Sequence, residues 1–255
     1  MNLSCCIWAL SGTLEEDLKK IAAAGFGWID IRPHTLSPGQ SLGAVLPVSC
    51  IALSHGAPAG ALLASRDPAA AAHARAYLDG ALEYGAAQGA TAAYVVPEDD
   101  GSLENLSRYA DALGAAAEYA ATLGLKLCVE HFPGSALPTI AATLGFVRSV
   151  DHPNLYLLLD VGHAQMSGED AAAAIAAAGA QLGYVHLDDN DGRNDSHLAL
   201  LDGVMSAETL CRTFAALQSS GYQGNVSLEL HAELPDPLAA LIKSRKVLNE
   251  IVGIS

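Results

Sequence analysis

Short apolar runs alternate with longer, often alanine-rich stretches along the whole chain. The runs are apolar throughout, without a regular exchange of polar and apolar positions, which is typical of parallel strands buried on both faces. They predict strands at residues 3–8, 28–32, 48–54, 92–96, 125–130, 155–160, 184–187 and 226–230.

The stretches between the runs carry the start and stop signals of helices. Thr13 and Asp67 stand at N-cap positions, and Pro68 follows Asp67 at the first helical position. Gly25 and Gly124 come just after helix ends, where glycine often adopts the left-handed conformation. The predicted helices are residues 13–24, 68–88, 103–123, 139–150, 169–178, 207–219 and 237–251.

This order of elements predicts an α/β fold, a (β/α)8 TIM barrel that forms a single domain over residues 1–255. A doubly wound open sheet is the alternative, but no GxGxxG turn follows the first predicted strand. Pro, Gly and Ser are frequent in residues 33–47, so we expect the second helix of the barrel to be degenerate.

Composition and charge exclude several classes of partner. The chain has 13 Lys and Arg residues against 28 Asp and Glu, a formal net charge of −15, and 51% hydrophobic residues. It is therefore a core-forming globular chain whose acidity disfavours binding to nucleic acid and to anionic membranes. The five cysteines show no CxxC pair, and no targeting segment or membrane span is evident, so we expect a reduced, cytoplasmic protein.

Ionisable side chains stand at or near the ends of the last four predicted strands: Glu130, Asp160, His186 and Glu229. In a barrel these strand ends converge on the C-terminal mouth, where binding sites are built. Three carboxylates and one imidazole meeting there would repel one another unless a cation or protons intervened. Each residue alone also reads as a helix cap, a loop hydrogen-bonder or a core histidine, so the prediction rests on the repeated position.

An oxygen-rich set with one imidazole suits one divalent metal ion, Mn²⁺ or Mg²⁺ first, with Co²⁺ or Zn²⁺ as alternatives. Such an ion acts as a Lewis acid on a hydroxy-ketone and stabilises the enediolate formed when the α-carbon loses its proton. Glu130 and Glu229 would serve as the catalytic general base and acid.

The segments EHFPG, LDVGHA, VHLDDNDGRNDSH and SLELH resemble the xylose isomerase-like TIM barrel superfamily, the sugar phosphate isomerase/epimerase group. The resemblance extends over essentially the whole chain and is most specific from residue 125 onward. It implies that the four strand-end residues bind one metal ion and that His163 and Arg193 contact substrate oxygens. The relatives include ketose epimerases, aldose–ketose isomerases, inosose dehydratases and apurinic-site endonucleases.

The chain departs from two of these relatives. Several ketose epimerases carry a further Glu six residues after the first ligand, where this chain has Ala136. Asp195 and His197 resemble an Asp-x-His that binds an additional zinc in the endonucleases, but residues 96–98 offer no histidine for the rest of that site. We therefore interpret Asp195 and His197 as residues that order the seventh loop, with a substrate or metal role as the alternative.

Other residues after the early strands would face the mouth. His34 follows the second predicted strand and His55 the third, and each would contact the substrate or form hydrogen bonds within its loop. Trp8 would form an apolar wall for a sugar ring or pack in the core. Arg32 is interpreted as an ion-pair residue.

The leading hypothesis is a metal-dependent isomerase or epimerase of a sugar or related hydroxy-ketone. The alternatives are a dehydratase acting on a ketosugar or cyclitol and, more remotely, a sugar-binding barrel without turnover or an apurinic-site endonuclease. The expected partner is a small carbohydrate, and the alanine-rich helices would suit packing in a homo-oligomer.

Overall fold

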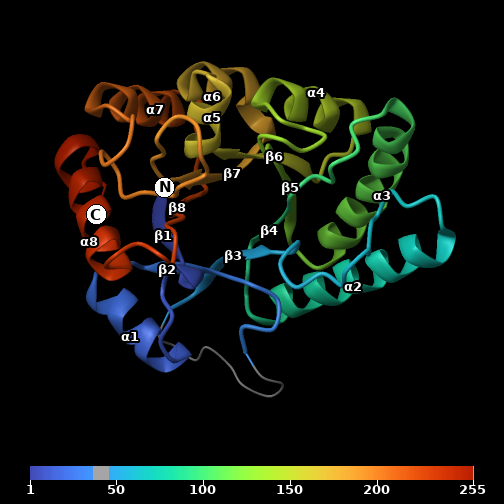
Figure 1. Ribbon diagram of the computed structural model, residues 1–255, viewed down its shortest axis with the longest axis horizontal. Coiled ribbons are helices and arrows are strands. Elements are labelled where there is room, and N and C mark those ends of the chain that lie inside the picture. The colour runs from blue at the N-terminus through green and yellow to red at the C-terminus, as the bar shows by residue number, and fades with distance from the viewer. Residues whose placement is uncertain (37–45, 255) are drawn as a thin grey trace.

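Eight parallel strands close into a barrel, as the sequence predicts (Figure 1). The computed structural model describes residues 1–36 and 46–254. Neighbouring strands pair in chain order, and β8 pairs with β1 to close the sheet. The strands are β1 (Asn2–Cys6), β2 (Trp28–Ile31), β3 (Val48–Ala52), β4 (Ala92–Val95), β5 (Lys126–Glu130), β6 (Leu155–Asp160), β7 (Leu182–Leu187) and β8 (Asn225–Leu228).

Side chains alternate between the inside of the barrel and its helical cover, and both faces are buried. Tyr94, Cys128 and Leu158 belong to one apolar cluster with Cys50 and Tyr184, drawn from alternate positions of successive strands. The intervening residues of the strands join a second, larger cluster with the helices. Burial on both faces explains why the strands are continuous apolar runs in the sequence.

The predicted helices form on the outside of the barrel, each behind its capping residue. Thr13 caps the first helix in a capping box with Glu16, and Asp67 accepts a hydrogen bond from the Ala69 amide at the start of the second. The helices are α1 (Leu14–Ala23), α2 (Pro68–Ala87), α3 (Leu103–Thr122), α4 (Ile140–Val150), α5 (Val161–Ser167), α6 (Ala171–Ala178), α7 (Ala207–Ser219) and α8 (Pro237–Val252).

Three details differ from the sequence prediction or go beyond it. Strand β1 ends at Cys6, and a 3-10 turn (Ile7–Ala9) carries Trp8, which the prediction placed in the strand. Helix α5 was not predicted, because its seven residues are too few for a helical period and follow β6 without a loop. We predicted that residues 33–47 form a loop in place of the second barrel helix. Of these, residues 37–45 lie outside the described residues.

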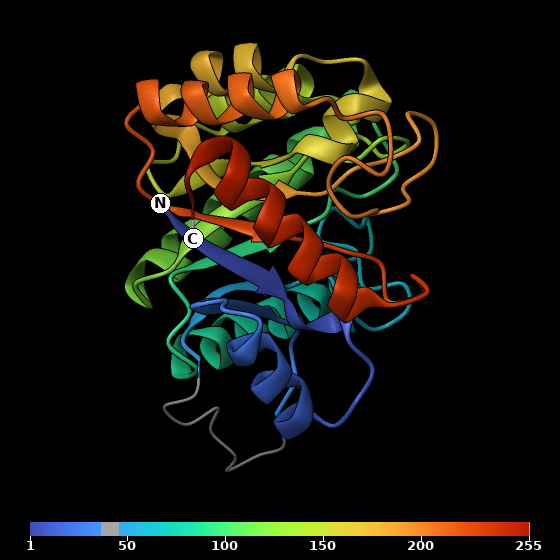
Figure 2. The same cartoon turned by 90° about the vertical axis from the view of Figure 1, so that its left-hand side faces the viewer.

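The strands all point to one end of the barrel, where the connections to the following helices gather. Figure 2 shows the arrow of β1 directed toward that end, whereas both termini lie near the opposite end. In the described part of the chain no helix is both long and apolar enough to cross a bilayer. All five cysteines are free; Cys211 is exposed and the other four are buried in strands.

Candidate functional site

The four strand-end residues predicted as metal ligands meet inside the barrel mouth. Each lies two positions beyond an inward-facing strand residue, so the period of the strand turns it inward as well. All four are buried, and each offers a donor atom within 4.8 Å of the others. The inward residues are Cys128, Leu158, Tyr184 and Ser227, and the side chains beyond them are Glu130, Asp160, His186 and Glu229.

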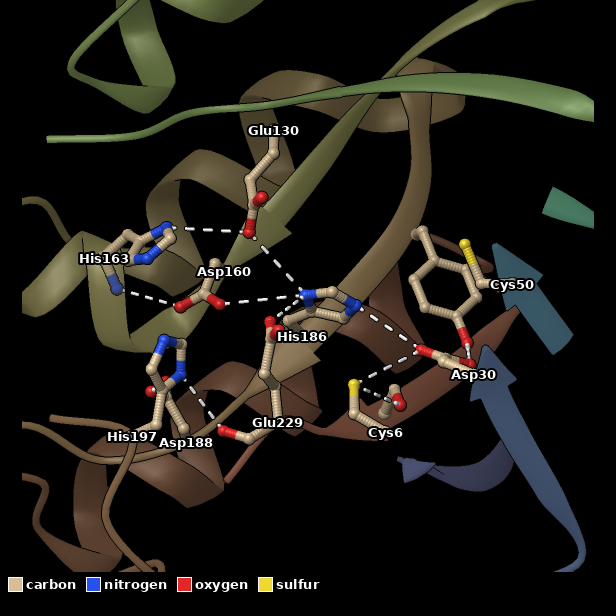
Figure 3. A network of polar contacts seen from close by, with 12 residues as sticks. Cys6, Asp30, Cys50, Glu130, Asp160, His163, His186, Asp188, His197 and Glu229 are labelled. Atoms are coloured by element: carbon tan, nitrogen blue, oxygen red, sulfur yellow. Dashed lines mark hydrogen bonds and ion pairs between the residues drawn. The ribbon is translucent and has the colours of Figure 1, made fainter. Parts of the chain in front are cut away.

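His186 stands at the centre of this cluster (Figure 3). Its Nδ1 atom lies 2.6 Å from Oε2 of Glu229, 3.6 Å from Oε1 of Glu130 and 3.9 Å from Oδ2 of Asp160. Despite these distances, neither Nδ1 nor Oδ2 of Asp160 makes a hydrogen bond within the described residues. Buried polar atoms that face one another without hydrogen bonds fit a divalent cation at their common centre, so this donor set suits a metal ion.

Without a cation, protons offset the charge of the cluster. Burial opposes protonation of His186, but the charge of Glu229 and the contacts with Asp30 and Glu130 raise its pKa well above the ordinary value. Burial raises the pKa of Glu130. Burial acts the same way on Glu229, but the positive charge of His186 outweighs it and lowers the pKa of Glu229 to about 2.

Asp30 holds the other side of the His186 ring and was missed by the sequence analysis. It is fully buried on β2, and its Oδ2 lies 3.5 Å from Nε2 of His186. Its Oδ1 accepts hydrogen bonds from the hydroxyl groups of Tyr184, at 2.7 Å, and Ser49. A carboxylate on the far nitrogen of a histidine orients that ring toward a metal ion. The only sequence signal was one acidic residue inside an apolar run.

Asp160 has two roles in the local structure. Its Oδ1 accepts a hydrogen bond of 2.9 Å from the His163 amide and so caps α5, whereas its Oδ2 faces His186. The cap turns the His163 side chain into the site, with Nδ1 3.0 Å from the carbonyl oxygen of His131. Because a carbonyl only accepts, Nδ1 of His163 carries the proton.

Asp188, Asp195 and His197 form a second polar cluster with His163, next to the first. Nε2 of His163 lies 3.3 Å, and Nε2 of His197 3.1 Å, from Oδ1 of Asp195, and Nδ1 of His197 lies 2.7 Å from the buried Asp188. Burial opposes the charged imidazoles, but the surrounding carboxylates raise the pKa of His163 to about 10 and that of His197 to about 12. These contacts agree with the interpretation that Asp195 and His197 order the seventh loop.

Buried polar residues at the end of β7 anchor this loop, residues 188–205, and the sequence analysis did not single them out. Asp189 accepts hydrogen bonds from the amides of Gly203 and Met205, at 2.8 and 2.9 Å. Asn190 accepts one of 2.9 Å from the His197 amide through its side-chain oxygen. The loop is therefore fixed at its base by these buried side chains together with an antiparallel backbone bridge between Asp189 and Leu198.

Replacing Gly162 by Ala is expected to disturb this loop. A Cβ atom at Gly162 would lie 1.9 Å from Oδ1 of Asp188 and 2.5 Å from Nδ2 of Asn190, so the loop base must move. We expect a loss of about 1–3 kcal/mol in the free energy of unfolding, measured by urea denaturation. Gly145→Ala in α4 is the matched control, because nothing lies within 4 Å of its Cβ and alanine favours a helix. Equal stability of both variants would contradict the packing described here.

A cavity of about 390 Å³ opens above the cluster and contains most of the predicted substrate contacts. Trp8 and His55 lie on one side with ring centroids 5.7 Å apart, and His163 lies on the other side. His34 and Arg193 are exposed and do not line it, so their roles stay predictions. The residues that line the cavity are Trp8, Arg32, His55, Tyr94, Val96, Glu130, Phe132, His163, Asp195, His197, Glu229, Leu230, His231 and Ala232.

A closed barrel of eight parallel strands defines the class of the protein, a TIM barrel. Within this class, residues 18–251 match the xylose isomerase-like TIM barrel family. The chain belongs to that family, which confirms the resemblance seen in the sequence motifs.

The curated relatives include a ketose epimerase and several inosose dehydratases. L-ribulose 3-epimerase of Methylomonas sp. (strain DH-1) is 31% identical over 140 residues, which cover 53% of this chain and 46% of that protein. Inosose dehydratase of Klebsiella pneumoniae (strain 342) is 29% identical over 173 residues, 60% of this chain and 57% of that protein. The chain thus spans about half the length of the curated relatives it matches.

Solved structures match over nearly the whole chain. An L-ribulose 3-epimerase has a TM-score of 0.84 at 22% identity, covering 98% of this chain and 93% of that one. D-allulose 3-epimerase from Methylomonas sp. in complex with D-allulose has a TM-score of 0.80 at 22% identity, with 98% and 97% covered. The IolI protein with a binding zinc atom has a TM-score of 0.80 at 20% identity, with 99% and 98% covered. At these identities the likeness shows the fold.

Proposed function

We propose that the chain is a divalent-metal-dependent isomerase or epimerase of a sugar or a related hydroxy-ketone. The observation that carries this proposal is the convergence of three carboxylates and one imidazole within 4.8 Å beneath the cavity. Similarity to an L-ribulose 3-epimerase supports it. The small carbohydrate would enter at the C-terminal mouth of the barrel.

The metal ligands would be Glu130, Asp160, His186 and Glu229. When bound, the cation would polarise the carbonyl group of the substrate as a Lewis acid. Their oxygen-rich chemistry favours Mn²⁺ or Mg²⁺, and Co²⁺ or Zn²⁺ would also suit the single imidazole.

Glu130 would remove the proton from the α-carbon. It lines the cavity, and its raised pKa brings it closer to the pH at which a base works best. Glu229 also lines the cavity, where the indole N–H of Trp8 donates a 3.1 Å hydrogen bond to its Oε1. Because these carboxylates come from β5 and β8, they would approach the substrate from different sides. Protonation of the same carbon from the other side inverts it, and protonation of its neighbour isomerises the substrate.

The residues on the walls would hold the substrate. His163 is fixed by the carbonyl group of His131 and would contact a substrate oxygen, as would His55. Trp8 would present its ring to the apolar face of a sugar. Asp195 and His197 face the same cavity and would reach hydroxyl groups at the other end.

A dehydratase of a ketosugar or cyclitol is the second candidate, favoured by the similarity to inosose dehydratases. The same base would begin this reaction, and a hydroxyl group on the neighbouring carbon would then leave. The two candidates share the site and differ in the fate of the carbanion.

Proton exchange in D₂O is the test of the proposed function. We expect the Mn²⁺-loaded protein to incorporate deuterium next to the carbonyl group of at least one ketose, seen by NMR. A dehydratase would instead give an enone with a new ultraviolet absorbance. If a broad panel of ketoses and inososes gives neither exchange nor product, the proposal of an enzyme is wrong and binding without turnover takes its place.

A further inference from the structure

Arg32 stands in the cavity wall without a carboxylate partner, contrary to the ion pair expected from the sequence. It follows β2 directly, is half-buried and lines the cavity. No Asp or Glu oxygen of the described residues lies within 4.0 Å of it, and residues 37–45 contain no acidic side chain. Arg75, by contrast, forms an ion pair with Asp79 at 2.6 Å.

The guanidinium group of Arg32 is held in place by stacking. Its Cζ atom lies 4.8 Å from the centre of the Trp8 ring, and the Trp8 indole is itself hydrogen-bonded to Glu229. Stacking on an aromatic face fixes the planar group and leaves its edge, which carries the N–H donors, for another partner. The indole of Trp8 therefore contacts both Arg32 and Glu229.

One donor of Arg32 is buried and has no acceptor. The Nε atom is shielded from solvent and makes no hydrogen bond within the described part of the chain. An unsatisfied buried donor on a charged group is costly, and an acceptor supplied by a ligand would remove that cost. Arginine presents its N–H groups as a fork that matches a carboxylate or a phosphate.

One positive side chain faces the otherwise acidic cavity. The acidic lining residues Glu130 and Asp195 come from β5 and the β7–α7 loop, and Glu229 follows β8 directly. Arg32 is the sole Lys or Arg among the lining residues of the described chain, and it stacks on Trp8, whose indole N–H is hydrogen-bonded to Glu229. A substrate in this cavity thus meets the carboxylates of the proposed metal ligands and one cation.

We infer that Arg32 forms an anion subsite and that the substrate is a hydroxy-ketone bearing a carboxylate or phosphate group. The inference rests on the proposed function for the hydroxy-ketone end and on Arg32 for the acidic end. It names a substrate class that differs from the neutral ketose D-allulose bound by the solved relative.

Calorimetric titration of the Mn²⁺-loaded protein with D-fructose, D-fructuronate and D-fructose 6-phosphate tests the inference. The three ligands share one ketose and differ at carbon 6, which carries a hydroxyl, a carboxylate or a phosphate group. We expect at least one acid to bind about 10- to 100-fold more tightly than D-fructose, and the favoured acid tells carboxylate from phosphate. Arg32→Met should erase this ratio, and Arg32→Lys should restore part of it.

Arg66→Met is the matched control, because it removes one positive charge from an exposed pair with Glu104. The ratio is the decisive readout, since a merely structural role of Arg32 would weaken all three ligands equally. The inference is wrong if no acid binds more tightly than D-fructose at any concentration reached, or if Arg32→Met keeps the ratio. If an acidic ligand binds through Arg32 but no ketose exchanges its α-proton, the proposed function is wrong and the anion subsite is still supported.

Discussion

Replacing Glu130 by Gln is expected to reduce exchange of the substrate α-proton with solvent by about 10²–10⁴-fold. The amide has the shape of the carboxyl group but no basic oxygen, so the proton has no acceptor in the cavity. The measurement is deuterium incorporation by NMR under Mn²⁺ saturation. The variant should fold, because removal of one of several mutually repelling buried carboxylates relieves repulsion in the barrel mouth.

Two controls make this result interpretable. Glu118→Gln changes an exposed carboxylate on α3 in the same way and should leave exchange unchanged. Metal content by mass spectrometry separates the loss of a base from the loss of a ligand, since Glu130 is assigned both roles. Full exchange by a folded Glu130→Gln variant would rule out Glu130 as the base.

Removal of the metal ion by a chelator is expected to lower the melting temperature, and more at pH 8.5 than at pH 6.5. At a free metal concentration about 100 times its dissociation constant, the ion adds about 2.7 kcal/mol of stability. For a chain of this size that corresponds to a shift of roughly 5–10 °C. Differential scanning fluorimetry of chelated and Mn²⁺-loaded samples gives the difference.

The direction with pH follows from the histidines of the site. An unfolded histidine has a pKa of about 6.5, whereas those of His163 and His197 are raised in the fold to about 10 and about 12. Groups with a raised pKa stabilise the fold fully below about pH 6.5 and lose that contribution as the pH rises toward the folded value. The chelated protein should therefore weaken from pH 6.5 upward. The pKa of His186, a proposed metal ligand, is raised as well, and because the cation binds only the unprotonated ring, metal binding and the stability it adds should grow as the pH rises. A difference that shrinks with pH would contradict a metal at this cluster.

The barrel and the convergence of the four strand-end residues were predictable because they depend on regular repetition. Apolar runs and capped helices fix the order of the elements, and strand period then turns Glu130, Asp160 and His186 inward at one level. Even the boundary of α7 follows from Ser206, which caps it. The sequence prediction and the structure agree where strand period or helix capping alone determines the position of a residue.

The rest of the site depends on contacts between distant segments, which no local pattern reveals. Asp30 meets His186 from across the barrel, 156 positions away in sequence by subtraction of the two residue numbers. The interpretation of Arg32 as an ion-pair residue is wrong, because none of the acidic side chains in the described residues forms an ion pair with it, although Glu130, Asp195 and Glu229 line the same cavity. Asp189 and Asn190 read as ordinary loop residues, and their burial appears only once the loop folds over the end of β7.

The way the β7–α7 loop is tied down has a consequence for how this barrel can diversify. Its anchors, Asp189 and Asn190, sit at the base, whereas the exposed turn at 191–194 is closed by hydrogen bonds from the amides of Arg193 and Asn194 to Asp191 alone. The turn lies outside the cavity lining, and its contact with the rest of the loop includes the hydrogen bond from the Ser196 hydroxyl to the Asn194 carbonyl oxygen. Substitutions in this turn can therefore change the surface beside the cavity while Asp189 and Asn190 keep the base of the loop in place.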